Sequence, residues 1–154
     1  MKILILTQKV DKNDPILGFF HGWLIEFSKH FESIIVICLE KGQSSLPSNV
    51  NVVSLGKETK VSKLSYIKNF YSYIWREKKN YDAVFVHMNQ EYILLGSLLW
   101  KLLGKKITLW RNHHAGNILT DIAVFLCDKV FCTSKYSYTA KFANTTLMPV
   151  GINT

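Results

Sequence analysis

The chain opens with the aliphatic run KILILT at residues 2–7, which gives way to a polar stretch at 8–15. An apolar run with no polar alternation is typical of a strand that is buried on both faces of a sheet. The following segment, 18–31, instead spaces its large apolar residues three and four positions apart, which predicts a helix. The chain therefore begins with a strand followed by a helix, the repeating element of α/β proteins.

The same alternation continues to the end of the chain. Further strands are predicted at 33–39, 50–55, 81–87, 106–110, 129–133 and 145–148, and further helices at 62–79, 91–103, 117–126 and 134–142. The strand at 50–55 alternates apolar and polar residues, so we expect it to be more peripheral than the others. This order predicts an α/β fold with a doubly wound parallel sheet, that is, a Rossmann-like single three-layer α/β/α domain.

Length and composition fit one folded domain: 154 residues, of which 48% are hydrophobic and 19% charged. No apolar run reaches the roughly 18–20 residues of a membrane span, and the N-terminus lacks the pattern of a signal peptide, so we expect a cytoplasmic protein. The three cysteines form no CxxC pair, which favours buried thiols in a reducing compartment.

The chain is basic, with 19 Lys and Arg against 11 Asp and Glu and a net charge of +8. Such a field favours nucleic acid, anionic membrane surfaces or phosphorylated small molecules. Basic and aromatic residues interleave at 57–79, which suits an anionic bilayer surface, single-stranded nucleic acid, or a solvated helix whose aromatics belong to the core. The residues expected to face a membrane are Lys60, Lys63, Lys68, Trp75 and Arg76.

Ligands bind doubly wound folds beyond the carboxyl ends of the strands, so polar residues at those ends are the candidate site residues. The densest group is RNHHAGN at 111–117, where Arg111 offers a donor fork for phosphate. We expect His113 or His114 to lie close to the reacting centre, and Asn112 to bind substrate. A purely structural polar turn is the alternative. No Cys or carboxylate stands at ligand spacing, so neither a metal nor a cofactor is expected.

Other strand ends carry further candidates. His87 ends the strand at 81–87 and Asn89 follows it, at a place where an imidazole can hydrogen-bond a sugar or phosphate or move a proton. A purely structural histidine is the alternative. Gly18 begins a helix and can let a phosphate approach backbone N–H groups, although neither GxGxxG nor a P-loop is present. Its alternative role is to turn the chain. Ser134 and Lys135 suit an anion at a helix start, and a capped surface helix explains them nearly as well.

The layout resembles the N-terminal half of GT-B glycosyltransferases, especially the large retaining family 4. The segments that carry the resemblance are MKILIL at 1–6, the loop containing Gly18, YDAVFVH at 81–87, the histidine-bearing turn after 106–110, DKVFCTSK at 128–135 and MPVGIN at 148–153. The last is similar to the family's Pro-Asn-Gly-Ile-Asp hinge, with Val150 and Asn153 in place of Asn and Asp. Leu17 stands where the family usually has the first glycine of a pair.

The resemblance implies a hexosyltransferase that moves a sugar from a nucleotide sugar to a glycan or lipid-linked acceptor, in cell-surface polysaccharide or glycolipid synthesis. Residues 1–150 correspond to the acceptor-side domain, and 151–154 to the start of a hinge toward a domain that holds most of the donor. His113 or His114 would contact the donor sugar, Gly18 would approach the donor phosphates, and His87 and Arg111 would line the acceptor side.

We expect the chain to be a shortened form of a longer enzyme, rather than an isolated domain or a subunit of a split enzyme. Alone it should be inactive, because it cannot orient both reactants. The basic segment implies peripheral contact with the inner face of the plasma membrane. The alternative function is a non-catalytic basic α/β module that binds nucleic acid or another anionic partner, although no helix–turn–helix, KH or RRM signature is present.

Overall fold

A computed structural model describes residues 1–149. The strands are β1 (Lys2–Val10), β2 (Ser33–Lys41), β3 (Val50–Ser54), β4 (Ala83–His87), β5 (Lys106–Trp110), β6 (Lys129–Cys132) and β7 (Thr145–Leu147). The helices are α1 (Phe19–Ser28), α2 (Lys63–Arg76), α3 (Glu91–Leu102) and α4 (Ile118–Leu126), with 3₁₀ turns η1 (Lys57–Thr59) and η2 (Tyr138–Lys141). The hinge predicted at 151–154 lies outside the described residues.

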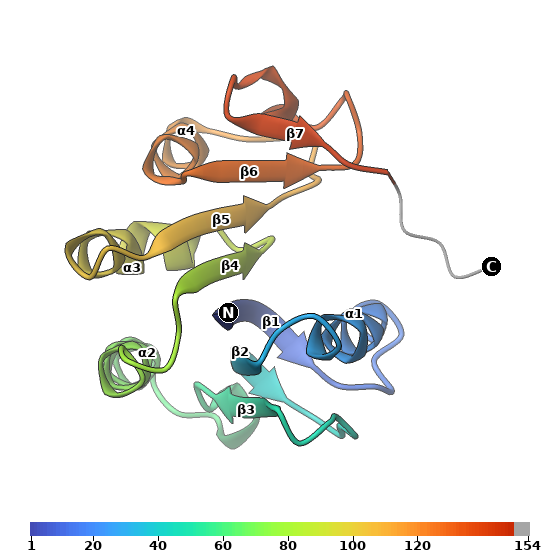
Figure 1. The fold of residues 1–154 in the computed structure, drawn as a ribbon, viewed down its shortest axis with the longest axis vertical. Helices are drawn as coiled ribbons and strands as arrows, with labels where there is room; N and C mark the ends of the chain where they lie inside the picture. The colour runs from blue at the N-terminus through green and yellow to red at the C-terminus, as the bar shows by residue number, and fades with distance from the viewer. Residues whose placement is uncertain (150–154) are drawn as a thin grey trace. The chain divides into compact units, whose positions relative to one another are not determined.

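The strands form a seven-stranded sheet in the order β3-β2-β1-β4-β5-β6-β7 (Figure 1). β1 pairs with β2, β2 with β3, β5 with β6, and β6 with β7, all in parallel. The predicted doubly wound parallel sheet is therefore confirmed, as is the edge position of β3. Two compact units make up the chain, one covering Met1–Val84 and the other beginning at Phe85.

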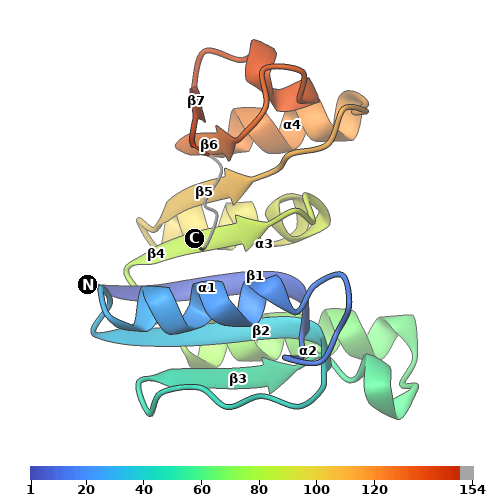
Figure 2. The same ribbon diagram turned by 90° about the vertical axis from the view of Figure 1, so that its right-hand side faces the viewer.

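The first unit is built on β1 and β2, whose central residues are buried without alternation. Figure 2 shows the reason, because α1 lies across one face of these strands and α2 lies on the other. α1 buries Phe20 and Leu24, and α2 buries Phe70 and Ile74. Two-sided burial accounts for the unbroken aliphatic run from which the strand was predicted.

The second unit packs α3 and α4 side by side against one face of β5 and β6 (Figure 1). Trp100 of α3 is fully buried, and its ring lies where a side chain at Gly96 would stand: a Cβ there would come within 2.4 Å of it. A larger residue at position 96 would therefore displace the tryptophan. Gly96 thus lets the largest side chain of this core lie flat against its own helix.

One predicted helix is wrong. Residues 134–142 form a turn followed by η2, rather than an α-helix. The Ser134 hydroxyl accepts a hydrogen bond from the Tyr136 amide at 3.2 Å, which closes a local turn. Ser137 and Thr139 also direct their hydroxyls to backbone outside the segment. Short hydroxyl side chains compete with helical hydrogen bonds in this way, so the hydroxyl-rich sequence favours the turn.

The three cysteines are buried and free, as predicted. Burial raises the pKa of the Cys38 and Cys127 thiols to about 12, which keeps both protonated at neutral pH. Among the helices of residues 1–149, none has the length and apolar character needed to cross a membrane.

Candidate functional site

The carboxyl ends of β5 and β6 are joined by one amide side chain. The Asn112 Oδ1 atom accepts hydrogen bonds from the backbone N–H groups of Thr133 at 3.2 Å and Ser134 at 3.1 Å. The Arg111 amide in turn donates to the Phe131 carbonyl at 3.0 Å. The predicted site residues Arg111, Asn112 and Ser134 are thus brought together at one corner of the second unit.

Two hydroxyl side chains that were not among the predicted site residues also hydrogen-bond to the backbone of this corner. Ser137 Oγ and Thr139 Oγ1 both donate to the Arg111 carbonyl, at 3.1 and 3.0 Å. The Tyr138 amide donates to the His113 carbonyl at 2.9 Å. The backbone of the 111–113 turn is therefore fixed by η2 and the residue before it. The alternation of Ser and Thr at 137 and 139 was the available signal, but the predicted helix masked it.

Gly116 and Asn117, at the C-terminal end of the polar turn, have structural roles. Asn117 caps α4 by accepting from the amides of Leu119 and Thr120, at 3.1 and 3.2 Å. A Cβ at Gly116 would lie 2.2 Å from the ring of Tyr138, so only glycine fits between the turn and that ring. The Tyr138 hydroxyl donates to Asp121 at 2.9 Å, which anchors the ring on α4.

The two candidate catalytic histidines are exposed and stack on each other, with ring centroids 4.6 Å apart and an interplanar angle of 23°. Nδ1 of His113 lies 3.1 Å from both the amide nitrogen and the carbonyl oxygen of Ala115. One of these contacts is a hydrogen bond in either neutral tautomer, so the ring orientation is fixed. The other ring nitrogen, Nε2, makes no hydrogen bond within residues 1–149 and can meet a ligand.

Arg111 is half-buried, and only part of the hydrogen-bonding capacity of its guanidinium is used. Its Nη2 donates to the Ala115 carbonyl at 2.9 Å, whereas Nη1 is buried and has no hydrogen-bond partner within the described residues. Burial lowers the pKa of the guanidinium, against the opposing effect of Glu91 and Tyr138. A partly desolvated guanidinium with donor capacity to spare is well suited to a phosphate or carboxylate.

His87 lies in the interior, with only 1% of its surface exposed. Its ring stacks on Trp110 at 5.0 Å and 18°, and burial lowers its pKa to about 4, which leaves it neutral at pH 7. The next residue, Met88, has a positive φ of 67°, and the Asn89 amide donates to the His87 carbonyl at 2.8 Å. This placement favours a packing role for His87 and leaves Asn89 in the tight turn before α3.

Lys135 is exposed, and its ammonium lies 5.2 Å from the ring centroid of Tyr136, next to Ser134 in the sequence. No group of three or more His, Cys, Asp and Glu side chains within residues 1–149 is arranged to hold a metal ion.

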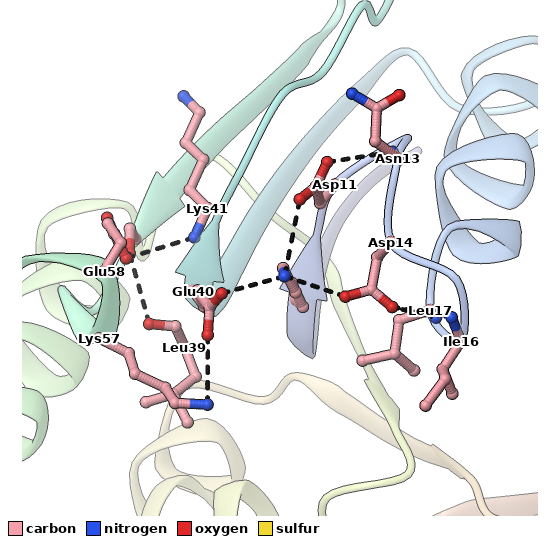
Figure 3. Close-up of polar contacts among 12 residues, drawn as sticks. Asp11, Asn13, Asp14, Ile16, Leu17, Leu39, Glu40, Lys41, Lys57 and Glu58 are labelled. Atoms are coloured by element: carbon pink, nitrogen blue, oxygen red, sulfur yellow. Dashed lines mark hydrogen bonds and ion pairs between the residues drawn. The ribbon is translucent and has the colours of Figure 1, made fainter.

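In the first unit, a cluster of ion pairs lies at the carboxyl end of β1, and the sequence analysis did not predict it. Figure 3 shows Asp11, Asp14 and Glu40 joined by dashed lines to one unlabelled nitrogen, and the ion pairs identify it as Nζ of Lys9. The Lys9 nitrogen lies 2.9 Å from Asp14, 3.0 Å from Glu40 and 3.6 Å from Asp11. Glu40 also pairs with Lys57 at 3.2 Å, which connects the cluster to η1.

This cluster organises the loop that leads to Gly18. Asp14 accepts from the amides of Leu17 and Ile16, and these bonds together with Lys9 lower its pKa to about 2, the Leu17 bond being the largest cause. The Gly18 amide donates to the Asp14 carbonyl at 3.0 Å, and a Cβ at Gly18 would stand 2.5 Å from that oxygen. Gly18 is therefore required for a close backbone approach, and its own N–H is already engaged.

Replacing Lys9 by Met should make the first unit sensitive to acid. Asp14 and Glu40 have lowered pKa values, so each stabilises the fold above its unfolded pKa, and this stability is lost as pH falls through the folded pKa. Without the ammonium both pKa values rise, and acid unfolding should begin at higher pH. NMR titration of the carboxyl groups measures the shift. Lys12→Met, at an exposed neighbouring lysine, is the control, and equal acid transitions in both variants would contradict the expectation.

The basic segment at 57–79 contains both buried and exposed aromatic and apolar side chains. Phe70 and Ile74 of α2 are buried, as the core alternative expects, whereas Trp75 is 55% exposed and lies under the Lys78 ammonium at 3.2 Å. Arg76 pairs with Glu77 at 2.9 Å. The remaining predicted membrane-facing residues, all exposed, are Lys60, Lys63 and Lys68. Exposed apolar residues lie along the same helix at Leu64, Ile67 and Tyr71.

The parallel α/β architecture, with polar residues gathered at the carboxyl ends of β5 and β6, defines a Rossmann-like domain. Residues 17–113 match the family model described as glycosyl transferase 4-like. The chain belongs to this glycosyl transferase 4-like family. The family match, together with the parallel α/β fold, confirms the resemblance to the N-terminal domains of GT-B glycosyltransferases.

Solved structures show the same fold. HepE of Anabaena, solved in complex with UDP, superposes with a TM-score of 0.65 at 18% identity, over 99% of this chain and 45% of HepE. The lipopolysaccharide outer core galactosyltransferase WaaB, in its apo form, gives 0.61 at 14% identity, over 100% of this chain and 47% of WaaB. MurG of Acinetobacter baumannii gives 0.64 at 9% identity, over 99% and 46%.

The chain spans less than half the length of each of these three proteins. No sequence among the curated proteins matches it.

Proposed function

We propose that the chain is the acceptor-side half of a retaining hexosyltransferase that uses a nucleotide sugar. The acceptor is a glycan or a lipid-linked sugar, in the synthesis of cell-surface polysaccharide or glycolipid. The observation that carries the proposal is the braced 111–116 turn, which presents an oriented imidazole beside a partly desolvated guanidinium in a glycosyl transferase 4-like chain.

Within this turn the residues take different roles. His113 contacts the donor sugar near the reacting carbon through Nε2, because its Nδ1 is fixed by Ala115 and Nε2 is available. His114 supports that ring by stacking on it. Arg111 donates a hydrogen bond from Nη1 to an anionic group of the substrate. Lys135 follows Ser134, whose amide bonds to Asn112, and adds a second positive charge there.

The donor is held mainly by a second domain, for which the length of the relatives leaves room, since this chain covers 45% of HepE and 47% of WaaB. Asn112 fixes the conformation of the 111–116 turn that meets the substrate. His87 contributes through its packing against Trp110. The chain alone then lacks the surface that aligns the two reactants, so the large advantage of proximity is missing.

Joining the chain to the part of HepE that it does not cover tests this proposal. The readout is release of nucleoside diphosphate from a set of nucleotide sugars, with water receiving the sugar in place of the unidentified acceptor. The joined protein should turn over repeatedly, and the chain alone should not. HepE divided and rejoined at the same point is the control. Multiple turnovers by the chain alone, or none by a folded joined protein when the rejoined HepE is active, would contradict the proposal.

We also place α2 at the inner face of the plasma membrane. α2 contains no Asp or Glu, and its exposed lysines flank exposed apolar side chains, a combination that suits anionic lipid headgroups. Peripheral attachment would bring the enzyme to a lipid-linked acceptor.

Replacing Lys63 and Lys68 by Gln should weaken binding to phosphatidylglycerol vesicles by about 30-fold, because each lysine near an anionic surface contributes about 1 kcal/mol. Vesicle sedimentation measures this change, and added salt should reduce the difference. The control removes two exposed lysines elsewhere, Lys12 and Lys129. An equal loss in both variants would show a response to net charge alone. Binding of single-stranded DNA that falls while vesicle binding does not would favour the nucleic-acid alternative.

A further inference from the structure

Two buried polar atoms near the carboxyl ends of β4 and β5 have no hydrogen-bond partner within residues 1–149. One is Nη1 of Arg111, which can only donate, and the other is Oε1 of Gln90, which accepts. The whole Gln90 side chain is withdrawn from solvent, since the residue is only 8% exposed. A buried donor or acceptor without a partner destabilises the fold by the cost of its desolvation. Such atoms therefore indicate a bound water molecule or a ligand.

The backbone brings these two residues to the same edge of the sheet. β4 and β5 are neighbours, and the Met88 amide donates to the carbonyl of Trp110, the residue before Arg111, at 2.7 Å. Gln90 follows two positions after Met88 and begins α3, which starts beyond the end of β4 (Figure 1). Burial lowers the pKa of Arg111, and the carboxylate of Glu91, the first residue of α3, opposes that shift. The guanidinium therefore lies near the first turn of α3.

Both side chains are held without the use of these two atoms. The Gln90 carbonyl accepts from the Ile93 amide at 3.0 Å, whereas its side chain makes no capping hydrogen bond. Arg111 is fixed through Nη2, which donates to the Ala115 carbonyl at 2.9 Å. Glu91 is exposed and leaves Nη1 unpaired within the described residues. The donor and the acceptor are thus both available to one bound molecule.

We infer that the acceptor substrate is an anionic sugar held at these two points, an inference that rests on the proposed function. Nη1 of Arg111 donates to a carboxylate or phosphate of the sugar, and Oε1 of Gln90 accepts from a hydroxyl of the same sugar. A neutral sugar would leave the buried part of a positive charge uncompensated. An anion with no hydroxyl would leave Oε1 without a donor. A sugar that carries an anionic group supplies both partners in one molecule.

Chemical-shift titration of the isotopically labelled chain tests the inference. Glucuronate or glucose 1-phosphate should shift the side-chain signals of both Gln90 and Arg111, and the tighter ligand identifies the anion as carboxylate or phosphate. Glucose should bind at least about tenfold more weakly, because it lacks the charge-assisted bond to Arg111. Sulfate, which cannot donate, should shift Arg111 alone. Equal binding of glucose and glucuronate, or no shift with either anionic sugar, would overturn the inference.

The substitution Gln90→Leu removes the acceptor and keeps the approximate size of the side chain. It should weaken glucuronate binding about five- to tenfold and leave sulfate binding unchanged. The melting temperature should hold or rise, because an apolar group replaces a buried acceptor that has no partner in the fold. A lower melting temperature with unchanged glucuronate binding would show that Gln90 instead bonds an ordered water molecule, and would overturn the inference.

The matched control is Gln43→Leu in the first unit. Gln43 is exposed, and its Oε1 already accepts from the Asn13 side chain at 3.1 Å. This variant should bind glucuronate as tightly as the parent chain. An equal loss in the two variants would overturn the assignment to Gln90.

The nucleotide sugar separates this inference from the proposed function. In the joined protein it should move the Arg111 signals through the 111–116 turn and leave those of Gln90 unchanged. A shift at Gln90 would place the donor at this pair and overturn the inference. Release of nucleoside diphosphate to water does not involve the acceptor, so turnover without binding of an anionic sugar would contradict this inference alone. Anionic-sugar binding without turnover would contradict the proposed function alone.

Discussion

Replacing His113 by Ala in the joined protein is expected to lower kcat by about 100- to 10,000-fold, the range that a positioned imidazole contributes to catalysis. The effect should fall on kcat more than on KM, because the proposed contact is made with the reacting sugar and most donor binding comes from the second domain. Folding should be preserved, since the side chain is exposed and its hydrogen bonds within residues 1–149 are to Ala115. Steady-state release of nucleoside diphosphate measures both constants.

Three further variants separate contact from scaffolding. His113→Gln retains a donor and an acceptor but cannot shuttle a proton, so partial recovery would identify hydrogen bonding as the role of the ring. His114→Ala should have a smaller effect, because that ring only stacks on its neighbour. His30→Ala, in the turn after α1, should have none. A His113→Ala protein as active as its parent would remove this residue from the mechanism.

Replacing Trp100 by Ala is expected to lower the free energy of unfolding by about 3–5 kcal/mol, the usual cost of truncating a large buried aromatic residue. Trp100 is fully buried and packs against Gly96 of its own helix, so the cavity cannot be filled by a neighbour at position 96. Urea unfolding followed by circular dichroism measures the change.

The matched control is Trp75→Ala, which removes the same side chain from a position that is 55% exposed. Its effect should stay within about 0.5–1 kcal/mol. Equal losses from the two substitutions would mean that α3 is not anchored through Trp100.

β1 and β3 were predictable because β1 is covered on both faces and β3 lies at an edge of the sheet, and each condition leaves its own hydrophobic pattern. The aliphatic run at 2–7 predicted β1, and the alternation at 50–55 predicted its peripheral partner β3. β1 extends three residues further, to Val10, because Lys9 pairs in register with Glu40. That extension depends on a contact between distant residues and leaves no local pattern.

The polar corner could be predicted in part. The density of polar residues after β5 was a local signal, and the structure brings Arg111, Asn112 and Ser134 together there. The hydroxyls of Ser137 and Thr139 were also a local signal, but an ambiguous one, because a hydroxyl can cap a helix or bond distant backbone with the same local sequence. Burial of the strand-end histidine, His87, was likewise hidden, since it depends on stacking with Trp110 of another strand.

α3 shows a different limit of sequence reasoning. Its residues are apolar on nearly every side, a pattern normally read as a fully buried helix. Trp100 and Ile93 follow that rule, but Leu98 and Leu102 of the same helix are exposed. Periodicity alone cannot separate a side that meets the core from a side that meets a partner or a membrane.

NMR titration of the joined protein, with only this chain isotopically labelled, tests the proposed site most directly. On addition of a nucleotide sugar, the side-chain signals of Arg111 and His113 should shift together with the backbone amides of the 111–116 turn. Those of His30 should not move. If the joined protein is saturated with the nucleotide sugar and the signals of Arg111 and His113 do not shift, or if shifts are confined to residues 57–79, this assignment is contradicted.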